Sequence, residues 1–423
     1  MILAIHGWTR LINEKNKFKS RPQRQNVRNI MKKLLSIIAT TALVVSLTGC
    51  GATSNQKKDA ATTEPAHTTT EGSAEQTSTT AGDTTSKTKI ITDHAGVEVE
   101  IPTEINRVVV GNILPLASVL TVYLGGTDKI VGMHPASMGA AESGLLSELY
   151  PEILDAKTDF INGSEINVEE LLNLNPDIVI GVGAEQAQIL RDAGIPAVTV
   201  STSNWEYDVV ETYDQWIALF DQIFGDSELS DRISAYSQEA YNMVQERVSS
   251  ISEEDRKRVL VLYQYDEEAM LASGPNFFGQ FWCDASGSIN VAEEIVDGSS
   301  VTINMEQVYE WNPDVVILTN FSGTQPEDLY NNAVGNDDWS NVAAVKNKQV
   351  YKMPLGLYRT FTPGADTPVT LQWFAKTMYP ELFEDINIEE VTKSYFKDYY
   401  NVELTDGQVE NMYHPAREGA NGL

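Results

Sequence analysis

Two stretches of the chain, residues 167–180 and 304–317, repeat one another and constrain the fold more than any other feature. Seven of their fourteen positions are identical. In each stretch a glutamate, Glu169 or Glu306, falls in the first turn of a predicted short helix, where the helix dipole favours a carboxylate. Each helix is predicted to end at Asn-Pro, because proline disfavours helical angles in the residue before it. An aspartate and an apolar, β-branched run follow, which is typical of a buried parallel strand.

The repeat predicts two similar α/β lobes, each presenting one glutamate on a short helix. A single helix–turn–strand unit is common, and one such glutamate would be no more than a favourable helix charge. Two copies that keep the same glutamate favour a shared function for Glu169 and Glu306. The alternative, two ordinary first-turn charges, stays open.

The start of the chain has the pattern of an exported lipoprotein. Residues 1–30 are basic and without clear periodicity, and we interpret them as an upstream extension. In residues 31–49, two lysines precede an apolar segment too short for a membrane-spanning helix, as in a signal peptide. The sequence Leu47-Thr48-Gly49-Cys50 then resembles the lipobox of bacterial lipoproteins. It implies lipid on Cys50 and an extracytoplasmic protein anchored to the outer face of the cell membrane; the alternative is an uncleaved apolar stretch with a chance cysteine.

After Cys50 the sequence predicts a flexible segment and a strongly acidic mature chain. Residues 50–87 are rich in Thr, Ser, Ala and Gly and cannot bury enough surface to offset their ordering entropy, so they predict a disordered tether. Residues 1–49 hold nine of the 30 Lys and Arg and one of the 60 Asp and Glu, so the chain from Cys50 onward carries 21 basic and 59 acidic residues, a formal charge of −38. This charge argues against nucleic acid partners and against binding flat on an anionic lipid surface.

Cysteine and histidine usage gives no sign of a metal site. With Cys50 lipidated, Cys283 is the one other cysteine of the sequence, and we interpret it as a small buried apolar residue. Between residues 88 and 413 the only histidines are His94 and His134, too few for a bare metal ion unless carboxylates supply the other ligands. We expect no cofactor.

The folded part, about 88–413, is long enough for two cores and alternates strands with helices. This alternation predicts a β-hairpin followed by mostly parallel sheets. A long helical pattern, broken near Gly225-Asp226, separates the two halves that carry the repeat. We therefore predict an N-terminal α/β lobe at 88–225, an interlobe helix at 226–252 and a C-terminal α/β lobe at 253–423.

Several segments of residues 88–413 resemble the substrate-binding lipoproteins of ABC importers for iron-siderophore, haem and cobalamin complexes. They are the opening hairpin with Arg107-Val108-Val109, Lys129-Ile130-Val131-Gly132, both repeat units, Ala344-Val345-Lys346-Asn347 and Trp373-Phe374-Ala375-Lys376. The resemblance implies a class III periplasmic binding protein: two Rossmann-like α/β lobes joined by one long helix, with a ligand cleft between them. Closure on the ligand is expected to be modest, because a single helix resists bending.

The resemblance also implies roles for particular residues. In relatives a glutamate of each lobe docks on arginines of the two permease subunits, which carries over to Glu169 and Glu306; arginine binds carboxylates in a bidentate manner. The ligand is expected where the carboxyl ends of the strands face the cleft. The candidate ligand-binding residues there are Asn112, His134, Gly183, Tyr263, Tyr265, Phe278, Trp282, Asn320, Tyr358 and Arg359. For each aromatic residue the alternative is core packing, and for Arg359 it is a surface ion pair.

We therefore expect a monomeric, lipid-anchored binding protein, not an enzyme, that passes a metal chelate to a permease dimer. A ferric siderophore is the first expectation, and cobalamin, haem or an oxyanion such as molybdate are the alternatives. Two other classes of protein are the remaining alternatives. A metal-cluster or chelatase-type α/β enzyme would require clustered Cys or His residues, which the sequence lacks, and an acidic adhesin would require modular repeats, whereas the repeat here is the lobe unit.

Overall fold

The computed structural model describes residues 87–225, 227–295 and 298–422. The chain divides into two compact units, 1–80 and 81–423, and the described residues all belong to the second. The predicted signal peptide, Cys50 and nearly all of the predicted tether therefore lie outside the described residues. Among the helices of the described ranges, none has the length and apolar content needed to cross a bilayer.

The first half of the described chain builds a four-stranded parallel sheet. Its order is β4-β3-β7-β8, formed by Ile130–Gly132, Val108–Val110, Ile178–Val182 and Ala197–Thr199. Every residue of β3, β7 and β8 is buried, as expected for parallel strands covered on both faces. Along β3, Val108 and Val110 belong to one core cluster and Val109 to another, so the strand supplies both faces of the sheet.

Short helices and hairpins cover this sheet. The predicted opening hairpin is confirmed as antiparallel strands β1, Thr88–Thr92, and β2, Glu98–Pro102. The remaining elements are α3 (Leu116–Leu124), α4 (Pro135–Ser143), α5 (Leu145–Leu149), η1 (Pro151–Asp155), β5 (Ile161–Asn162), β6 (Glu165–Ile166), α6 (Val168–Asn173) and α7 (Ala184–Asp192).

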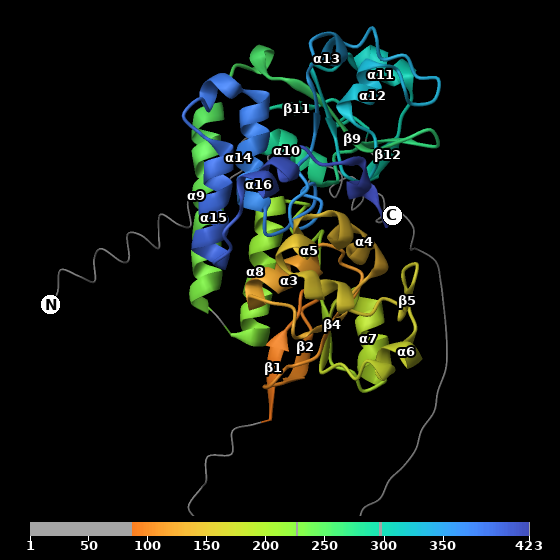
Figure 1. Ribbon diagram of the computed structural model, residues 1–423, viewed down its shortest axis with the longest axis vertical. Coiled ribbons are helices and arrows are strands. Elements are labelled where there is room, and N and C mark those ends of the chain that lie inside the picture. The colour runs from red at the N-terminus through yellow and green to blue at the C-terminus, as the bar shows by residue number, and fades with distance from the viewer. Residues whose placement is uncertain (1–86, 226, 296–297, 423) are drawn as a thin grey trace, which may run out of the picture. The chain divides into compact units, whose positions relative to one another are not determined.

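Two long helices link the halves. Helix α8 spans Val209–Phe224 and α9 spans Ser227–Val248. The break falls where the sequence indicated it, at Gly225, whose φ of 79° is in the left-handed region that glycine adopts without strain. Helix α9 packs against α8 on one side and against α14, Thr367–Met378, on the other (Figure 1).

The second half builds a larger, mixed sheet. Its order is β12-β10-β9-β13-β14, formed by Ser300–Thr302, Met270–Ser273, Arg258–Tyr265, Val315–Leu318 and Val350–Lys352, with β11, Ile289–Asn290, paired to the start of β9. Strands β9, β11, β13 and β14 are parallel, as predicted, but β10 is antiparallel to both its neighbours. The sequence gives no sign of the antiparallel strand β10, because the turn from β9 to β10 contains no Gly or Pro. It is held instead by Asp266, whose Oδ1 accepts from the N–H groups of Glu268 and Ala269.

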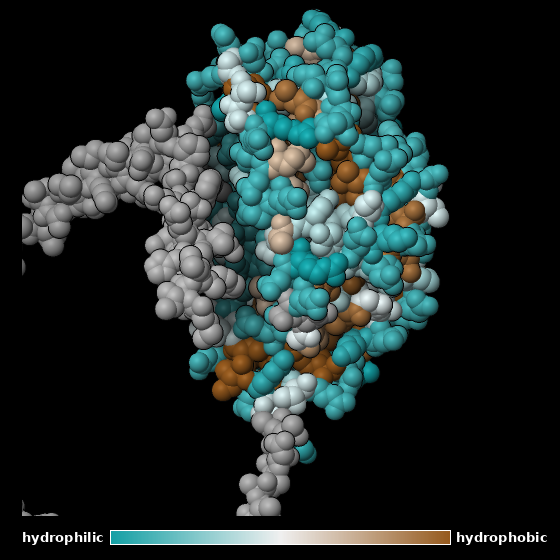
Figure 2. Space-filling model, turned by 90° about the vertical axis from the view of Figure 1, so that its left-hand side faces the viewer, coloured by the Kyte–Doolittle hydropathy of each residue, from teal (hydrophilic) through white to brown (hydrophobic). Residues whose placement is uncertain are grey.

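The other elements of this half are mostly helical. They are η2 (Glu253–Asp255), α10 (Phe278–Ala285), α11 (Met305–Trp311), α12 (Pro326–Tyr330), α13 (Ala343–Lys346), η3 (Pro380–Leu382), α15 (Ile388–Tyr400), α16 (Asp406–Tyr413) and η4 (Arg417–Ala420). Helices α9, α14 and α15 lie side by side (Figure 1). The face on their side is mostly hydrophilic, with small separate hydrophobic areas (Figure 2).

The last helices pack on the core of the first half. Phe396 of α15 and Met412 of α16 belong to the same buried cluster as Val108 and Leu116. The hydroxyls of Tyr213 in α8 and Tyr400 in α15 also form a buried hydrogen bond. The lobe limits at 225/226 and 252/253 stay a prediction, but the hydrophobic core does not follow them along the whole chain.

Candidate functional site

The two repeat units have matching local structure. Asn167 caps the start of α6, where its Oδ1 accepts from the N–H of Glu169 at 3.0 Å, and Asn304 caps the start of α11 in a capping box with Gln307. The asparagine before each proline, Asn175 or Asn312, has a positive φ of 46° or 41°. Proline excludes the helical conformation there, and asparagine is among the few residues that tolerate the left-handed one, so the pair ends the helix.

Each unit exposes a carboxylate next to an apolar side chain. Glu169 and Glu306 are exposed, and neither carboxylate has a hydrogen bond or ion pair within the described residues. Three positions later stand Leu172 and Tyr309, which are 49% and 43% exposed and are among the few large hydrophobic residues at the surface. Residues three apart share a helix face. The repeat therefore presents twice an exposed carboxylate beside a large exposed side chain, leucine in one unit and tyrosine in the other.

Three predicted ligand residues of the first half lie at the carboxyl end of its sheet. Asn112 follows β3 and His134 follows β4. Gly183 lies between β7 and α7 and is exposed. Asn112 donates from Nδ2 to the carbonyl oxygen of Ser164 at 2.9 Å, while its Oδ1 is buried with no partner among the described residues. This oxygen is free to accept from a polar ligand group, but several other buried side-chain oxygens of the described residues are also in the unpaired set, so it does not mark the site by itself.

His134 is held in one orientation. Its Nδ1 accepts from the N–H of Ala136 at 3.0 Å at the start of α4, so the proton of the neutral ring is on Nε2, which lies 3.1 Å from the carbonyl oxygen of Gly163. Burial lowers the pKa of His134, with the contact to Gly163 opposing the shift. The neutral form fits both contacts.

An aromatic cluster lies where the two halves meet. In the second half the Tyr263 ring is 4.9 Å from Phe321, 5.1 Å from Phe277 and 5.7 Å from Phe361, measured between centroids. From the first half, the ring of Tyr207 is 5.9 Å from Phe277. Of this cluster, Tyr207, Tyr263 and Phe277 are only half-buried. The predicted residue Phe278 belongs to it too, 5.3 Å from Tyr207, but is buried.

Tyr207 is a residue that the sequence reasoning missed. It and Glu206 both have a positive φ, 60° and 54°, which is uncommon for such side chains. Strained backbone of this kind persists where the surroundings impose it. Tyr207 contacts Phe277 and Phe278, which lie about 70 residues later in the sequence, so no local pattern predicts these contacts.

Three predicted residues point into cores instead. Tyr265 is fully buried against Trp339 and donates to Asp337 at 2.9 Å. The reason is a β-bulge in β9: Gln264 pairs with Leu271 but Leu262 pairs with Ala272, so Tyr263 is an extra residue and the side chains beyond it change face.

The other two residues, Trp282 and Asn320, are buried and donate hydrogen bonds to main-chain carbonyl oxygens. Trp282 donates from Nε1 to the carbonyl oxygen of Phe361 at 2.9 Å, and Asn320 donates from Nδ2 to those of Met353 and Pro354. In this structure Trp282 and Asn320 brace the loop around Tyr358 and Arg359. A direct ligand contact for them, or for Tyr265, stays a prediction.

Arg359 is fully buried beside the aromatic cluster. Its guanidinium carbon lies 5.2 Å from the centroid of the Phe321 ring and 5.3 Å from that of Tyr358. Nη1 donates to the hydroxyl of Tyr358 at 3.0 Å, whereas Nε and Nη2 donate to the carbonyl oxygens of Gly419 at 3.1 Å and Asn421 at 2.6 Å. These partners are a hydroxyl and two carbonyl oxygens, so the surface ion pair that was the alternative is not formed among the described residues.

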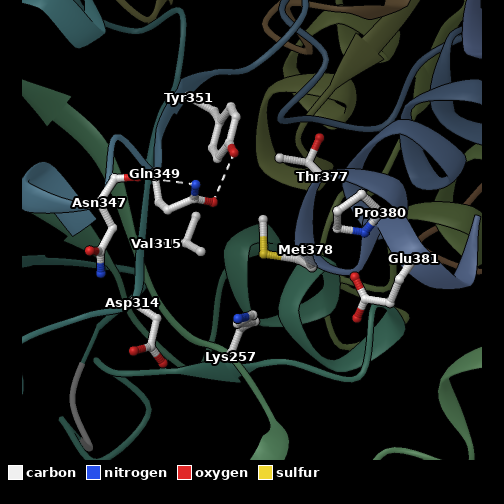
Figure 3. Close-up of a pocket in the computed structure, with 10 residues that line it drawn as sticks. All are labelled: Lys257, Asp314, Val315, Asn347, Gln349, Tyr351, Thr377, Met378, Pro380 and Glu381. Atoms are coloured by element: carbon white, nitrogen blue, oxygen red, sulfur yellow. Dashed lines mark hydrogen bonds between the residues drawn. The ribbon is translucent and has the colours of Figure 1, made fainter. Parts of the chain in front are cut away.

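A separate pocket of about 400 Å³ lies at the other end of the second sheet (Figure 3). Lys257, Asp314 and Gln349, at the starts of β9, β13 and β14, line it together with the end of α14 and Glu381. The carboxyl ends of the same strands carry Tyr263 and Arg359, so this pocket is not the predicted ligand site. Among the described residues there is also no cluster of three His, Cys, Asp or Glu side chains placed to hold a metal ion.

Residues 113–355 match the family model described as "Periplasmic binding protein". The chain belongs to this family. It is a substrate-binding protein of an ABC transporter, with a permease partner and a small-molecule ligand, and not an enzyme. The predicted architecture, two α/β lobes of the class III type, is confirmed.

Individual relatives of this binding protein cover most of its length. A periplasmic solute binding protein from Veillonella parvula is similar in structure, with a TM-score of 0.70 and 29% identity over 77% of this chain and 97% of its own. The molybdate-binding protein MolA of Haemophilus influenzae is 25% identical over 334 residues, 74% of this chain and 91% of MolA. The ABC transporter substrate-binding lipoprotein YvrC of Bacillus subtilis is 24% identical over 366 residues, 84% of this chain and all of YvrC.

Proposed function

We propose that this binding protein captures a ferric siderophore, or a similar metal chelate with a bulky organic shell. The observation that carries the proposal is the aromatic cluster at the junction of the halves, with Tyr207, Tyr263 and Phe277 half-buried. Such rings suit an organic ligand through stacking and dispersion, with a few polar groups setting its orientation. A bare cation would call for carboxylate or imidazole ligands in a cluster.

The polar groups expected to orient the ligand come from both halves. Asn112 has a buried, unpaired Oδ1, and His134 presents a neutral ring at the neighbouring strand end. Arg359 stands beside Phe321 and supplies a permanent positive charge, which suits the carboxylate or catecholate oxygens of a chelate.

Molybdate is the second candidate, and the similarity to MolA favours it. A tetrahedral oxyanion would be held by N–H donors and the Arg359 guanidinium, not by the rings. The two candidates therefore depend on different residues of the same region.

A ligand screen separates them. We expect a ferric siderophore to raise the melting temperature, because a ligand at one hundred times its Kd stabilises the native state by about 2.7 kcal/mol. The panel holds ferric hydroxamates, ferric catecholates, ferric citrate, haem, cobalamin and molybdate. Phe277→Ser should abolish a siderophore shift, and Tyr309→Ser, which removes an exposed ring elsewhere, is the matched control. A shift with molybdate alone, unaffected by Phe277→Ser, would select the second candidate, and no shift with any member would refute the proposal.

Docking to the permease is proposed for the two repeat units. Glu169 with Leu172, and Glu306 with Tyr309, each offer an exposed carboxylate beside an exposed apolar side chain. The carboxylate can take a bidentate arginine, and the apolar neighbour would exclude water from that ion pair. Two matched faces suit a permease with two related subunits.

Anchoring through lipid on Cys50 completes the proposal. Its support is the lipobox-like sequence and the similarity to YvrC, which is named as a lipoprotein. Cys50 lies outside the described residues. The protein would then act at the outer face of the cell membrane.

A further inference from the structure

Residues 415–422 lie between the two halves, across the carboxyl ends of the strands. Figure 1 shows this stretch, in dark blue near the label C, between α4 and the strands of the second sheet. On the first half, Gly422 touches Gly139 of α4 backbone to backbone: a Cβ built on Gly139 would come within 2.6 Å of the Gly422 Cα. On the second half, Gly419 packs against Leu355 so closely that a Cβ on Gly419 would lie 2.9 Å from the Leu355 side chain.

Polar contacts fasten this stretch to the second half. Arg417 forms a bidentate pair with Asp328, with distances of 2.6 and 2.7 Å, and Gln325 donates to the carbonyl oxygen of Pro415 at 3.2 Å. The Arg417–Asp328 pair lowers the pKa of Asp328, chiefly through the side-chain hydrogen bond. The stretch is therefore docked by specific contacts at both of its ends.

The stretch covers a concentration of positive charge in an acidic chain. Arg359, Arg417 and Lys352 lie near one another, and Lys352 is buried, donating to the carbonyl oxygens of Thr319, Ser322 and Thr324 at 2.6 to 2.9 Å. Burial lowers the pKa of Lys352 to about 7, and the nearby charges of Arg417 and Arg359 act in the same direction. Asp328 is the carboxylate that acts on Lys352 against this shift.

Two carbonyl oxygens of the stretch hold the Arg359 guanidinium. They belong to Gly419 and Asn421, and they accept from two different nitrogens of Arg359. Two acceptors on one guanidinium is the arrangement that a carboxylate or an oxyanion also makes. Both acceptors are neutral, and no carboxylate of the described residues forms an ion pair with Arg359.

We propose that residues 415–422 are a built-in competitor for Arg359, which an anionic ligand with at least two oxygen acceptors displaces. The inference rests on the proposed function, since it takes Arg359 to be part of the ligand site. Hydrogen bonds between charged partners are roughly twice as strong as neutral ones, so carboxylate or oxyanion oxygens outcompete the carbonyls of Gly419 and Asn421. A neutral ligand gains no such advantage, and the competitor therefore selects for anions.

The affinity of the ligand is then reduced by the fraction of time that the stretch is docked. If it is docked about nine-tenths of the time, the apparent Kd is about tenfold weaker than with Arg359 free. Substitutions that release the stretch but leave Arg359 in place should therefore lower the apparent Kd by about tenfold.

Gly139→Ala is the first such substitution, since its methyl group would meet the backbone of Asn421 and Gly422 while alanine suits a helix interior. Gly407→Ala, with nothing within 4 Å of the added Cβ, is the matched control. The second is Arg417→Gln, which removes the pair with Asp328, with the exposed neighbour Glu418→Gln as its control. All four are made in the full chain.

Hydrogen–deuterium exchange of a peptide covering 415–422 reports docking without any ligand, and titration with ferric citrate and with molybdate reports affinity. We expect faster exchange and about tenfold tighter binding of at least one anion in Gly139→Ala and Arg417→Gln, with both controls like the native chain. Ferric citrate or molybdate bound to the native chain should also speed exchange of 415–422.

Faster exchange with unchanged affinity would overturn the competitor and leave the proposed function standing. Unchanged exchange in both Gly139→Ala and Arg417→Gln would overturn it as well, because the contacts named here would not be what docks the stretch. If neither anion binds even where exchange shows the stretch released, the competitor is overturned, while the other chelates of the ligand panel still test the proposed function.

Discussion

Arg107 and Asp177 bind each other through two hydrogen bonds, one between their backbones and one from the Arg107 backbone to the Asp177 side chain. The carboxylate of Asp177 accepts from the N–H of Arg107 at 2.9 Å, and the N–H of Asp177 donates to the carbonyl oxygen of Arg107 at 2.8 Å. The guanidinium of Arg107 donates to the carbonyl oxygen of Leu174 at the end of α6. This pair fixes the end of a helix to the starts of β3 and β7, which then run in parallel.

The second half contains the same arrangement in Arg258 and Asp314. Asp314 accepts from the N–H of Arg258 at 3.0 Å and donates to its carbonyl oxygen at 2.8 Å, while Arg258 donates to the carbonyl oxygen of Trp311 at the end of α11. The repeat is therefore a structural unit that positions Glu169 and Glu306 on matching helices. The aspartate of Asn-Pro-Asp is conspicuous in the sequence, but its arginine partner lies some 56 to 70 residues earlier and gives no local signal.

The first prediction concerns this pair. Asp177→Ala and Asp314→Ala should each lower the free energy of unfolding by about 1–3 kcal/mol, because a charged acceptor of backbone N–H groups is lost. The loss should be larger for Asp177, which also accepts from the N–H of Asn106 at 2.7 Å. Urea unfolding measures both.

The exposed residue Asp159 supplies the control, since Asp159→Ala should change the stability little. A larger loss in Asp314→Ala than in Asp177→Ala would contradict the account of the pair.

The fold follows from the sequence where the pattern is local. The buried runs of β3, β7, β9 and β13 and the break at Gly225 are each visible in a short window of residues. The antiparallel β10 and the packing of α15 and α16 on the first half's core are not. The pattern of an amphipathic helix predicts that one face is buried, but it does not predict which core Phe396 and Met412 pack against.

The candidate site divides in the same way. Asn112, His134 and Gly183 could be found because each follows a predicted strand, and strand ends converge in such sheets. Regular alternation would put Tyr265 on the same face of β9 as Tyr263, but a bulge turns it to the other face, and that bulge is set by the pairing with β10. Tyr207 and residues 415–422 depend on contacts distant in sequence.

The second prediction is a pH dependence set by Asp366. This residue is buried, and its carboxylate accepts from the N–H of Leu357 at 3.1 Å in the loop that carries Arg359. Burial raises the pKa of Asp366 to about 7, with hydrogen bonds from the backbone opposing the shift. Between about pH 4 and pH 7 the folded state therefore keeps a proton that the unfolded chain has lost. The contribution of Asp366 to stability falls as the pH rises through this window and is constant above it.

Asp366→Asn keeps an oxygen that can accept from Leu357 but cannot ionise. Its stability relative to the native chain should rise between pH 4 and pH 7, by up to about 1.4 kcal/mol per pH unit. Urea unfolding of both proteins across this range gives the difference, and the exposed Asp159→Asn should show no such trend. A difference independent of pH would mean that Asp366 ionises normally.

The third prediction concerns anchoring. Cys50→Ala should leave the protein unlipidated, so that it is found in the soluble fraction or keeps its signal peptide. Fractionation with mass spectrometry of the N-terminal peptide measures both. Cys283→Ala is the control, because Cys283 is fully buried and burial raises the pKa of its thiol, which makes it unreactive. A mature chain that still begins at Met1, or equal membrane retention in Cys50→Ala, would be incompatible with lipidation.

The last prediction concerns docking. The double variant Glu169→Ala/Glu306→Ala should keep the ligand affinity and melting temperature of the native chain, because both carboxylates are exposed and have no partner within the described residues. Uptake should fall strongly, by about tenfold or more, because each lost carboxylate leaves permease arginines unpaired in the complex. Leu172→Ser and Tyr309→Ser should weaken uptake in the same way, again without changing ligand affinity.

The control removes the same charge from the same helices. Glu170 and Glu310 are also exposed, one on α6 and one on α11, but they are not related by the repeat. Glu170→Ala/Glu310→Ala should therefore transport almost normally. Equal losses in the two double variants would show that net charge matters and not the matched positions, and loss of ligand binding with normal docking would place Glu169 and Glu306 in the ligand site instead.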